Sequence, residues 1–304
     1  MALTLAQVAA TETDQVRRGV IELFREESTV FDRIPLAPIE GNAYSYNVED
    51  TLPGTGFRTV NEAYVESTGL INQRTENIVI LGGDSDVDRF LVNTSQQSIG
   101  DLRATYDRMK VKSAVATYVD AFFNGDVNVN PKGFDGLRKR LIGDQVIDSN
   151  ATTATEAFLD DLDLLFGQVE GGTPDAVYAP RQIIARLKSL GRKVGGAEYI
   201  NSEISGKREF TWNGVPFLEA GSHWDGRAIL PYDTTNGGDV YAVKFASSIP
   251  GDAGVIGLTN GGIQAYDLGE LDEKPAYRTR IEFYTGLAAQ GGHAAARLRG
   301  VKTA

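Results

Sequence analysis

Apolar positions recur at helical spacing in two parts of the N-terminal half. Residues 12–27 place Val16, Val20 and Phe24 three or four positions apart, which predicts a short amphipathic helix. Residues 97–123 carry a longer repeat whose other faces are charged, so we expect a spine helix lying along one face of a sheet. Its apolar stripe consists of Ile99, Leu102, Tyr106, Met109, Ala116, Val119 and Phe123.

Alternating apolar and polar positions predict a pair of strands before the spine helix. Tyr44, Tyr46 and Val48 alternate with polar residues, and residues 75–81 indicate the returning strand. Residues 51–74 between them hold one proline and three glycines but few bulky apolar side chains, so we expect a long hydrophilic loop that a partner orders.

An extended arm is predicted over residues 31–39, because Pro35 and Pro38 are incompatible with a helix. We expect this arm to need a surface outside its own subunit. The arm and the loop are therefore the first candidates for contacts between chains.

The second half of the chain reads as an α/β lobe followed by a C-terminal hairpin. A polar linker at residues 144–153 marks the lobe boundary. Helices are predicted around residues 158–166 and from Pro180 to Gly191, with a short buried strand at 175–179 between them. Further strands are expected at 210–212, 240–245 and 254–258. Residues 277–285 alternate, and we expect them to form a hairpin with residues 294–301.

Composition narrows the possible functions. The chain has 304 residues, enough for two lobes, and its lack of cysteine excludes disulfides and thiolate chemistry. No stretch has the apolar length of a membrane span, and no signal segment is evident, so we expect synthesis in the cytoplasm. The net charge of -11 argues against a protein that reads nucleic-acid sequence, but it is compatible with a container.

The residues that could carry chemistry lack the partners that chemistry needs. His223 and His293 stand alone, which is typical of surface or turn histidines. Asp84, Asp86 and Asp88 copy the start of a calcium loop, but Arg89 and Ser95 replace its glycine and glutamate, so we expect only a turn after residues 82–83. A third acidic group is expected to be the solvated side of a helix and consists of Asp160, Asp161 and Asp163. We predict no catalytic, cofactor-binding or metal site.

The order of these elements resembles the Hong Kong 97-type major capsid protein of tailed bacteriophages. The phrases Phe122–Asp126, Phe134–Leu137, Ile34–Ile39 and Asn42–Asn47 are also similar to phage coat proteins. The resemblance implies the α+β Hong Kong 97 capsid fold. Its expected parts are an N-arm at 1–40, an extended β-hairpin E-loop at 41–82, a P domain at 83–150 and 262–304 with its spine helix at 97–123, and an α/β A domain at 151–261.

The resemblance also implies a function without enzymatic activity. Pentamers and hexamers would form an icosahedral head around double-stranded DNA, which the shell contacts non-specifically. Expected partners are further copies of the chain, a portal, in some cases a decoration protein and, because Met1 lies close to the arm, a separate scaffolding protein. No membrane is involved, and the protein would reside in the virion.

Lysine usage limits the chemistry of the expected shell. Some family members crosslink subunits through an E-loop lysine, but the first lysine here is Lys110, so we expect a shell without such crosslinks.

Three other functions remain open. An encapsulin-like nanocompartment would share the fold and hold enzymes instead of a genome. An enzyme would have to use Asp84, Asp86, Asp88 or His223, and a binding module or tail component would not build a shell.

Overall fold

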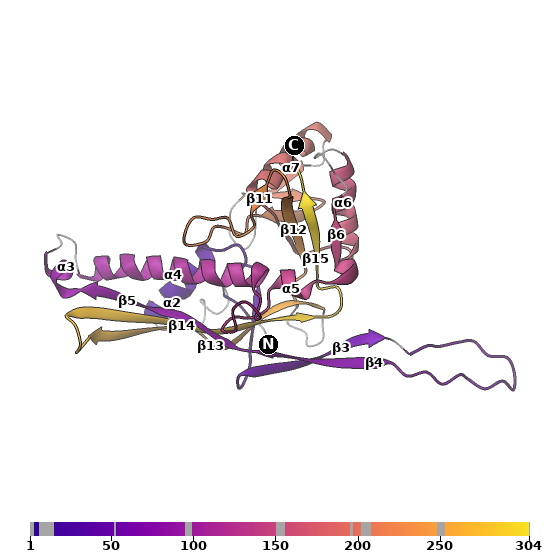
Figure 1. The fold of residues 1–304 in the computed structure, drawn as a ribbon, viewed down its shortest axis with the longest axis horizontal. Coiled ribbons are helices and arrows are strands. Elements are labelled where there is room, and N and C mark those ends of the chain that lie inside the picture. The colour runs from indigo at the N-terminus through magenta and orange to yellow at the C-terminus, as the bar shows by residue number, and fades with distance from the viewer. Residues whose placement is uncertain are drawn as a thin grey trace.

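Three parts are visible in a computed structural model of the chain. A long helix lies over a sheet, an upper lobe contains a second sheet with helices, and a hairpin extends away from both (Figure 1). The structure describes residues 3–5, 15–51, 53–94, 99–149, 156–194, 197–201, 208–247 and 253–303.

The spine sheet has five strands in the order β1-β2-β13-β14-β5. Its strands are β1 (Leu3–Thr4), β2 (Pro35–Pro38), β13 (Gly254–Glu270), β14 (Ala276–Gln290) and β5 (Val79–Asp88). The two longest strands, β13 and β14, pair antiparallel, and β5 lies antiparallel beside β14. The spine helix α4 (Ile99–Asn124) packs against β5 and β14, which confirms the predicted helix on a sheet.

The core beneath α4 is aromatic. Phe31 lies 4.4 Å from Tyr118 and 5.9 Å from Phe283 between ring centroids, and Phe24 of α2 (Gln15–Glu26) joins them at 5.5 Å from Phe31. Rings at such distances bury large apolar areas and add favourable edge and tilted contacts. This cluster joins α2, the arm, the spine helix and the sheet.

The expected stripe on the spine helix is wrong in its first half. Tyr106 and Met109 are exposed, whereas Val111, Val115 and Tyr118 are buried. The first half of the helix meets the sheet through polar contacts, in which Arg103 donates to Asp267 and Thr279. The buried apolar side chains of the described helix lie from Val111 onward. Residues 97 and 98 of the predicted helix lie outside the described residues.

The arm does find a surface within its own chain, contrary to expectation. Phe31, Ile34 and Leu36 are buried in the main core, and β2 pairs with β13 in parallel. Apolar side chains at these positions make burial on the sheet favourable, even though the prolines prevent a helix. Of the predicted N-arm, residues 1–2 and 6–14 are not among those described.

The lobe sheet has the strand order β6-β15-β12-β7-β10-β9-β8, with β11 beside β12. Its strands are β6 (Val146–Asp148), β15 (Ala295–Val301), β12 (Gly237–Val243), β7 (Ala176–Tyr178), β10 (Val215–Leu218), β9 (Arg208–Trp212), β8 (Ala197–Asn201) and β11 (Tyr232–Asp233). Helices α6 (Glu156–Gly167) and α7 (Arg181–Val194) share one apolar core with it. The short helices α3 (Arg89–Thr94), α5 (Leu137–Arg140) and η1 (Gly143–Gln145) lie in the connections.

The two sheets divide the chain differently from the sequence prediction. The expected C-terminal hairpin is wrong, because β15 leaves β14 and enters the lobe sheet between β12 and β6. Residues 146–148 of the expected linker form β6 there, while residues 150–153 lie outside the described part. The expected boundary between residues 261 and 262 falls inside β13. Helix α7 also continues past Gly191.

Candidate assembly surface

The hairpin consists of β3 (Ala43–Thr51) and β4 (Leu70–Asn77), paired antiparallel from Ala43↔Asn77 outward to Thr51↔Leu70. The first strand was predicted, but the returning strand was only partly so: it covers Leu70–Asn77 and not residues 75–81, because the chain turns into a separate strand, β5, at Val79. A two-stranded ribbon without a sheet behind it is marginal by itself. Its stability therefore depends on how its base is held.

The hairpin root, formed by Tyr46, Glu76 and Arg140, holds this base. Arg140 Nη2 donates to Glu76 Oε2 at 2.7 Å, and its Nη1 donates to the other carboxylate oxygen. Tyr46 donates its hydroxyl to Glu76 Oε1 at 3.3 Å, and burial together with the Glu76 charge raises the Tyr46 pKa. The Arg140 side chain is only 8% exposed.

Arg140 also connects the root to the rest of the subunit. Its Nε donates to the carbonyl of Asp135 at 2.6 Å, and its Nη2 donates to that of Leu287 at 3.0 Å. A planar guanidinium is suited to several such fixed contacts at once. Nearby, Gln290 donates to the Tyr44 hydroxyl at 2.7 Å. The start of the hairpin is thus fastened to α5 and β14.

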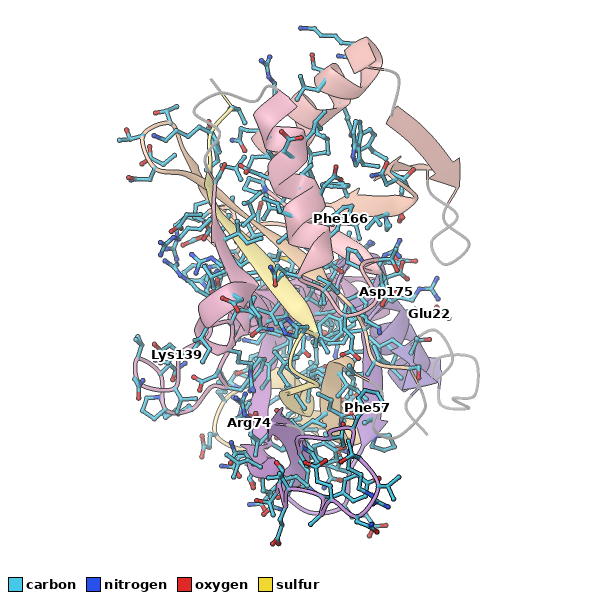
Figure 2. All side chains as sticks on the ribbon, turned by 90° about the vertical axis from the view of Figure 1, so that its right-hand side faces the viewer. Glu22, Phe57, Arg74, Lys139, Phe166 and Asp175 are labelled. Carbon is cyan, nitrogen blue, oxygen red and sulfur yellow. The ribbon has the colours of Figure 1, made fainter. Side chains whose placement is uncertain are left out.

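The hairpin tip, residues 53–69, is exposed throughout. Phe57, Val60, Tyr64 and Val65 are 110%, 90%, 70% and 91% exposed. The expected hydrophilic loop is therefore wrong: the tip presents a group of apolar side chains, and Figure 2 looks toward this end with Phe57 labelled. A group of large apolar side chains exposed in this way usually marks a contact with another molecule.

Local hydrogen bonds give the tip a shape. Glu62 Oε2 accepts from Thr59 N at 2.9 Å and from Thr59 Oγ1 at 2.8 Å, and these bonds lower the Glu62 pKa. The Ser67 hydroxyl accepts from Gly54 N at 2.9 Å. A tip with a defined shape can recognise a surface of another molecule.

The acidic run at Asp84 and Asp86 is part of strand β5, so the predicted turn is wrong. Asp84 lies opposite Arg280 and accepts from its Nε at 2.7 Å, and Asp86 lies opposite Arg278 and accepts at 2.6 Å. Hydrogen bonds from these guanidinium groups lower the pKa of both carboxyls. Lys274 also pairs with Asp86. The carboxylates are occupied by cations of their own chain.

The other predicted surface residues are also accounted for. His293 Nδ1 lies 3.1 Å from the carbonyl of Gln168, and His223 Nδ1 lies 3.3 Å from Asp225, a carboxylate that the sequence interpretation overlooked. Asp160 and Asp163 are exposed as expected. Asp161 is not on the solvated side: it is buried and accepts from Ser149 Oγ at 2.7 Å.

The described residues show neither a metal-binding cluster nor a membrane-spanning helix. They contain no group of three His, Asp or Glu side chains arranged to hold a metal ion. Among the helices of this part of the chain, none combines the length and apolarity needed to cross a membrane.

Comparison with known proteins gave a family match for part of the chain and a fold for nearly all of it. Residues 12–159, just under half of the chain, match the family model Major capsid protein GP7. No curated protein sequence matches the chain.

Solved structures match over nearly the whole chain. The SrpI encapsulin of Synechococcus elongatus is 18% identical with a TM-score of 0.65, covering 98% of this chain and 94% of that one. The capsid of a native GTA particle (15%, TM-score 0.63) and Microbacterium phage Oxtober96 (13%, TM-score 0.60) each match over 91% of both chains. The whole chain therefore shares the Hong Kong 97 capsid fold, and residues 12–159 are similar to a family of major capsid proteins.

Proposed function

We propose that the chain assembles into pentamers and hexamers that build an icosahedral phage head around double-stranded DNA. The observation that carries this proposal is the exposed apolar hairpin tip on a firmly held root. Leaving four large apolar side chains in water is unfavourable, and a neighbouring subunit would remove them from it.

The hairpin is suited to reach such a neighbour. It extends away from both sheets along the long axis of the molecule (Figure 1). A contact between a tip and a different surface of the next copy is heterologous, and repeated contacts of this type form rings when the rotation between copies closes. Pentamers and hexamers are the rings that an icosahedral shell needs.

The proposed content of the head is DNA contacted without sequence specificity. The net charge of -11 disfavours tight binding to phosphates, so DNA would be enclosed and not clamped. Further proposed partners are a separate scaffolding protein, a portal and, in some cases, a decoration protein. The protein would then reside in the virion after synthesis in the host cytoplasm, without enzymatic activity.

We further propose that the shell forms without covalent links from the hairpin. Residues 41–82 contain no lysine, so this segment has no ε-amine that could form an isopeptide bond. The shell should therefore dissociate into single chains in denaturing gel electrophoresis. A ladder of linked subunits would contradict this part of the proposal.

Electron microscopy of the purified chain, alone and with a candidate scaffolding protein, tests the proposed function. The expected result is closed particles with fivefold and sixfold capsomers. A single small species by light scattering at high concentration, under all of these conditions, would contradict it. Nuclease-resistant DNA in particles from infected cells would support the phage-head assignment.

An encapsulin-like nanocompartment is the second candidate. It is favoured by the match to the SrpI encapsulin, which extends over 98% of this chain. The two functions differ in what the shell contains. Particles that copurify with a folded protein and no DNA would favour the compartment.

A further inference from the structure

The two long helices of the upper lobe carry charges of opposite sign. Helix α6 has four acidic residues and no basic one, and α7 has five basic residues and no acidic one. The acidic set is Glu156, Asp160, Asp161 and Asp163, and the basic set is Arg181, Arg186, Lys188, Arg192 and Lys193.

Such segregation is unfavourable for an isolated subunit. Like charges three or four positions apart, such as Asp160 and Asp163, repel each other, whereas mixed signs would attract. The helix dipole accounts for only part of the pattern, because it favours bases in the last turn but disfavours Arg181 at the start of α7. A partner of opposite charge would compensate for this repulsion.

Some of these charges are already paired within the chain. Asp161 points inward and accepts from Ser149, and Arg181 donates to both carboxylate oxygens of Glu219 at 3.0 to 3.1 Å. Asp160 and Asp163 remain exposed beside Leu164, which is itself 57% exposed.

Arg192 and Lys193 are exposed in the last turn of α7. Within the described residues, neither these two cations nor Asp160 and Asp163 form an ion pair. The free acidic charges and the free basic charges thus lie on different helices.

The two charged surfaces lie at opposite edges of one sheet. Helix α6 packs against β15, next to edge strand β6, and Ser149, which bonds to α6, directly follows β6. Helix α7 packs against β8, the opposite edge strand, which begins at Ala197 soon after α7 ends. Both helices lie in the upper lobe in Figure 1, and α6 faces the viewer in Figure 2.

We propose that α6 of one copy binds the last turn of α7 of the next copy in the capsomer ring. This inference rests on the proposed assembly into rings. Asp160 and Asp163 would face Arg192 and Lys193, with Leu164 adding a small apolar contact. Opposite charges at opposite edges make a heterologous contact that selects one orientation of the neighbour and opposes like-edge pairing.

Charge reversal tests the contact. The first variant, Asp160→Lys with Asp163→Lys, makes both edges basic, and the second, Arg192→Glu with Lys193→Glu, makes both acidic. Each variant alone should yield at most roughly a tenth of the particles that the unchanged chain forms, because like charges would meet at every contact. The chain carrying all four substitutions should assemble again, since the opposite charges are restored in exchanged positions.

A mixture of the two reversed variants gives a sharper result. An alternating ring pairs unlike edges throughout only when its number of subunits is even. Hexamers should therefore recover in the mixture, while every pentamer keeps at least one like-charged contact. Sheets or tubes of hexamers should appear in place of closed shells. Equal recovery of both rings would contradict the contact.

The control variant, Asp160→Asn with Asp163→Asn, removes attraction without introducing repulsion and should assemble better than the lysine variant. Circular dichroism checks that each variant is folded. If the unchanged chain forms no particles, the proposed function fails. If the unchanged chain does form particles, two results would contradict only the helix contact. One is that the reversed variants assemble as well as the unchanged chain. The other is that the fourfold variant is folded but does not recover assembly.

Discussion

The core beneath the spine helix and the hairpin tip contain similar side chains in opposite environments. Phe31 and Phe283 are almost completely buried against Tyr118, whereas Phe57 and Tyr64 lie in the open. Burying one such ring is worth about 2 to 3 kcal/mol. The core uses that free energy to fold one subunit, and the tip retains it for contact with another. Folding and assembly can therefore be separated by mutation.

Phe31→Ala should have the largest effect on folding. The ring is fully buried and contacts Phe24, Tyr118 and Phe283, so its removal should lower the free energy of unfolding by about 4 kcal/mol. Urea denaturation of the dissociated subunit measures the change. A loss below about 1 kcal/mol would mean that the arm is not part of the folded core.

Glu76→Ala should have the next largest effect. It leaves Arg140, whose side chain is only 8% exposed, without its carboxylate, at a cost of about 3 kcal/mol. Glu219→Ala is the matched control, because its partner Arg181 is 80% exposed, and should cost less than about 1 kcal/mol. Similar losses in both variants, again by urea denaturation, would contradict the role of the root.

Acid should weaken the pairing of β5 with β14, and this should lower the free energy of unfolding by less than Glu76→Ala does. Hydrogen bonds from Arg280 and Arg278 depress the pKa of Asp84 and Asp86 in the folded state. Their stabilisation is therefore complete above the unfolded pKa of about 4 and is lost as the pH falls below it. Unfolding curves at pH 7 and pH 3 should differ less for the Asp84→Asn, Asp86→Asn variant. An equal difference in both proteins would rule out this contribution.

Phe57→Ser with Tyr64→Ser should have the smallest effect on folding. Both rings are exposed, so the free energy of unfolding should change by no more than about 0.5 kcal/mol. Particle formation should nevertheless be lost, because the apolar contact is removed. Unfolding curves and sedimentation of the same preparation measure the two properties. A stable subunit that still forms particles would show that the tip is dispensable.

Local patterns in the sequence predicted local elements well. The spine helix and the β3–β4 pairing follow from periodicities of 3.6 and 2, which depend on neighbouring residues only. The burial of the arm and the entry of β15 into the lobe sheet depend on contacts between residues far apart in the chain. No periodicity within either segment encodes them.

The hairpin tip and the hairpin root differ in how far the sequence alone could predict them. The apolar tip is visible in the sequence as Phe57, Val60, Tyr64 and Val65, but these residues are spaced among polar residues and glycines, a pattern that favours a hydrophilic loop. The root could not be found in this way, because Glu76 and Arg140 are 64 positions apart and meet only in the fold.

Labelling of a single cysteine tests most directly whether a neighbour covers the tip. The chain has no cysteine, so Tyr64→Cys introduces one reactive site, with Phe31→Cys as a buried control and Val129→Cys as an exposed one. The account predicts that a thiol reagent modifies Cys at position 64 rapidly in dissociated subunits and slowly in assembled particles. Equally rapid modification in both states would contradict it.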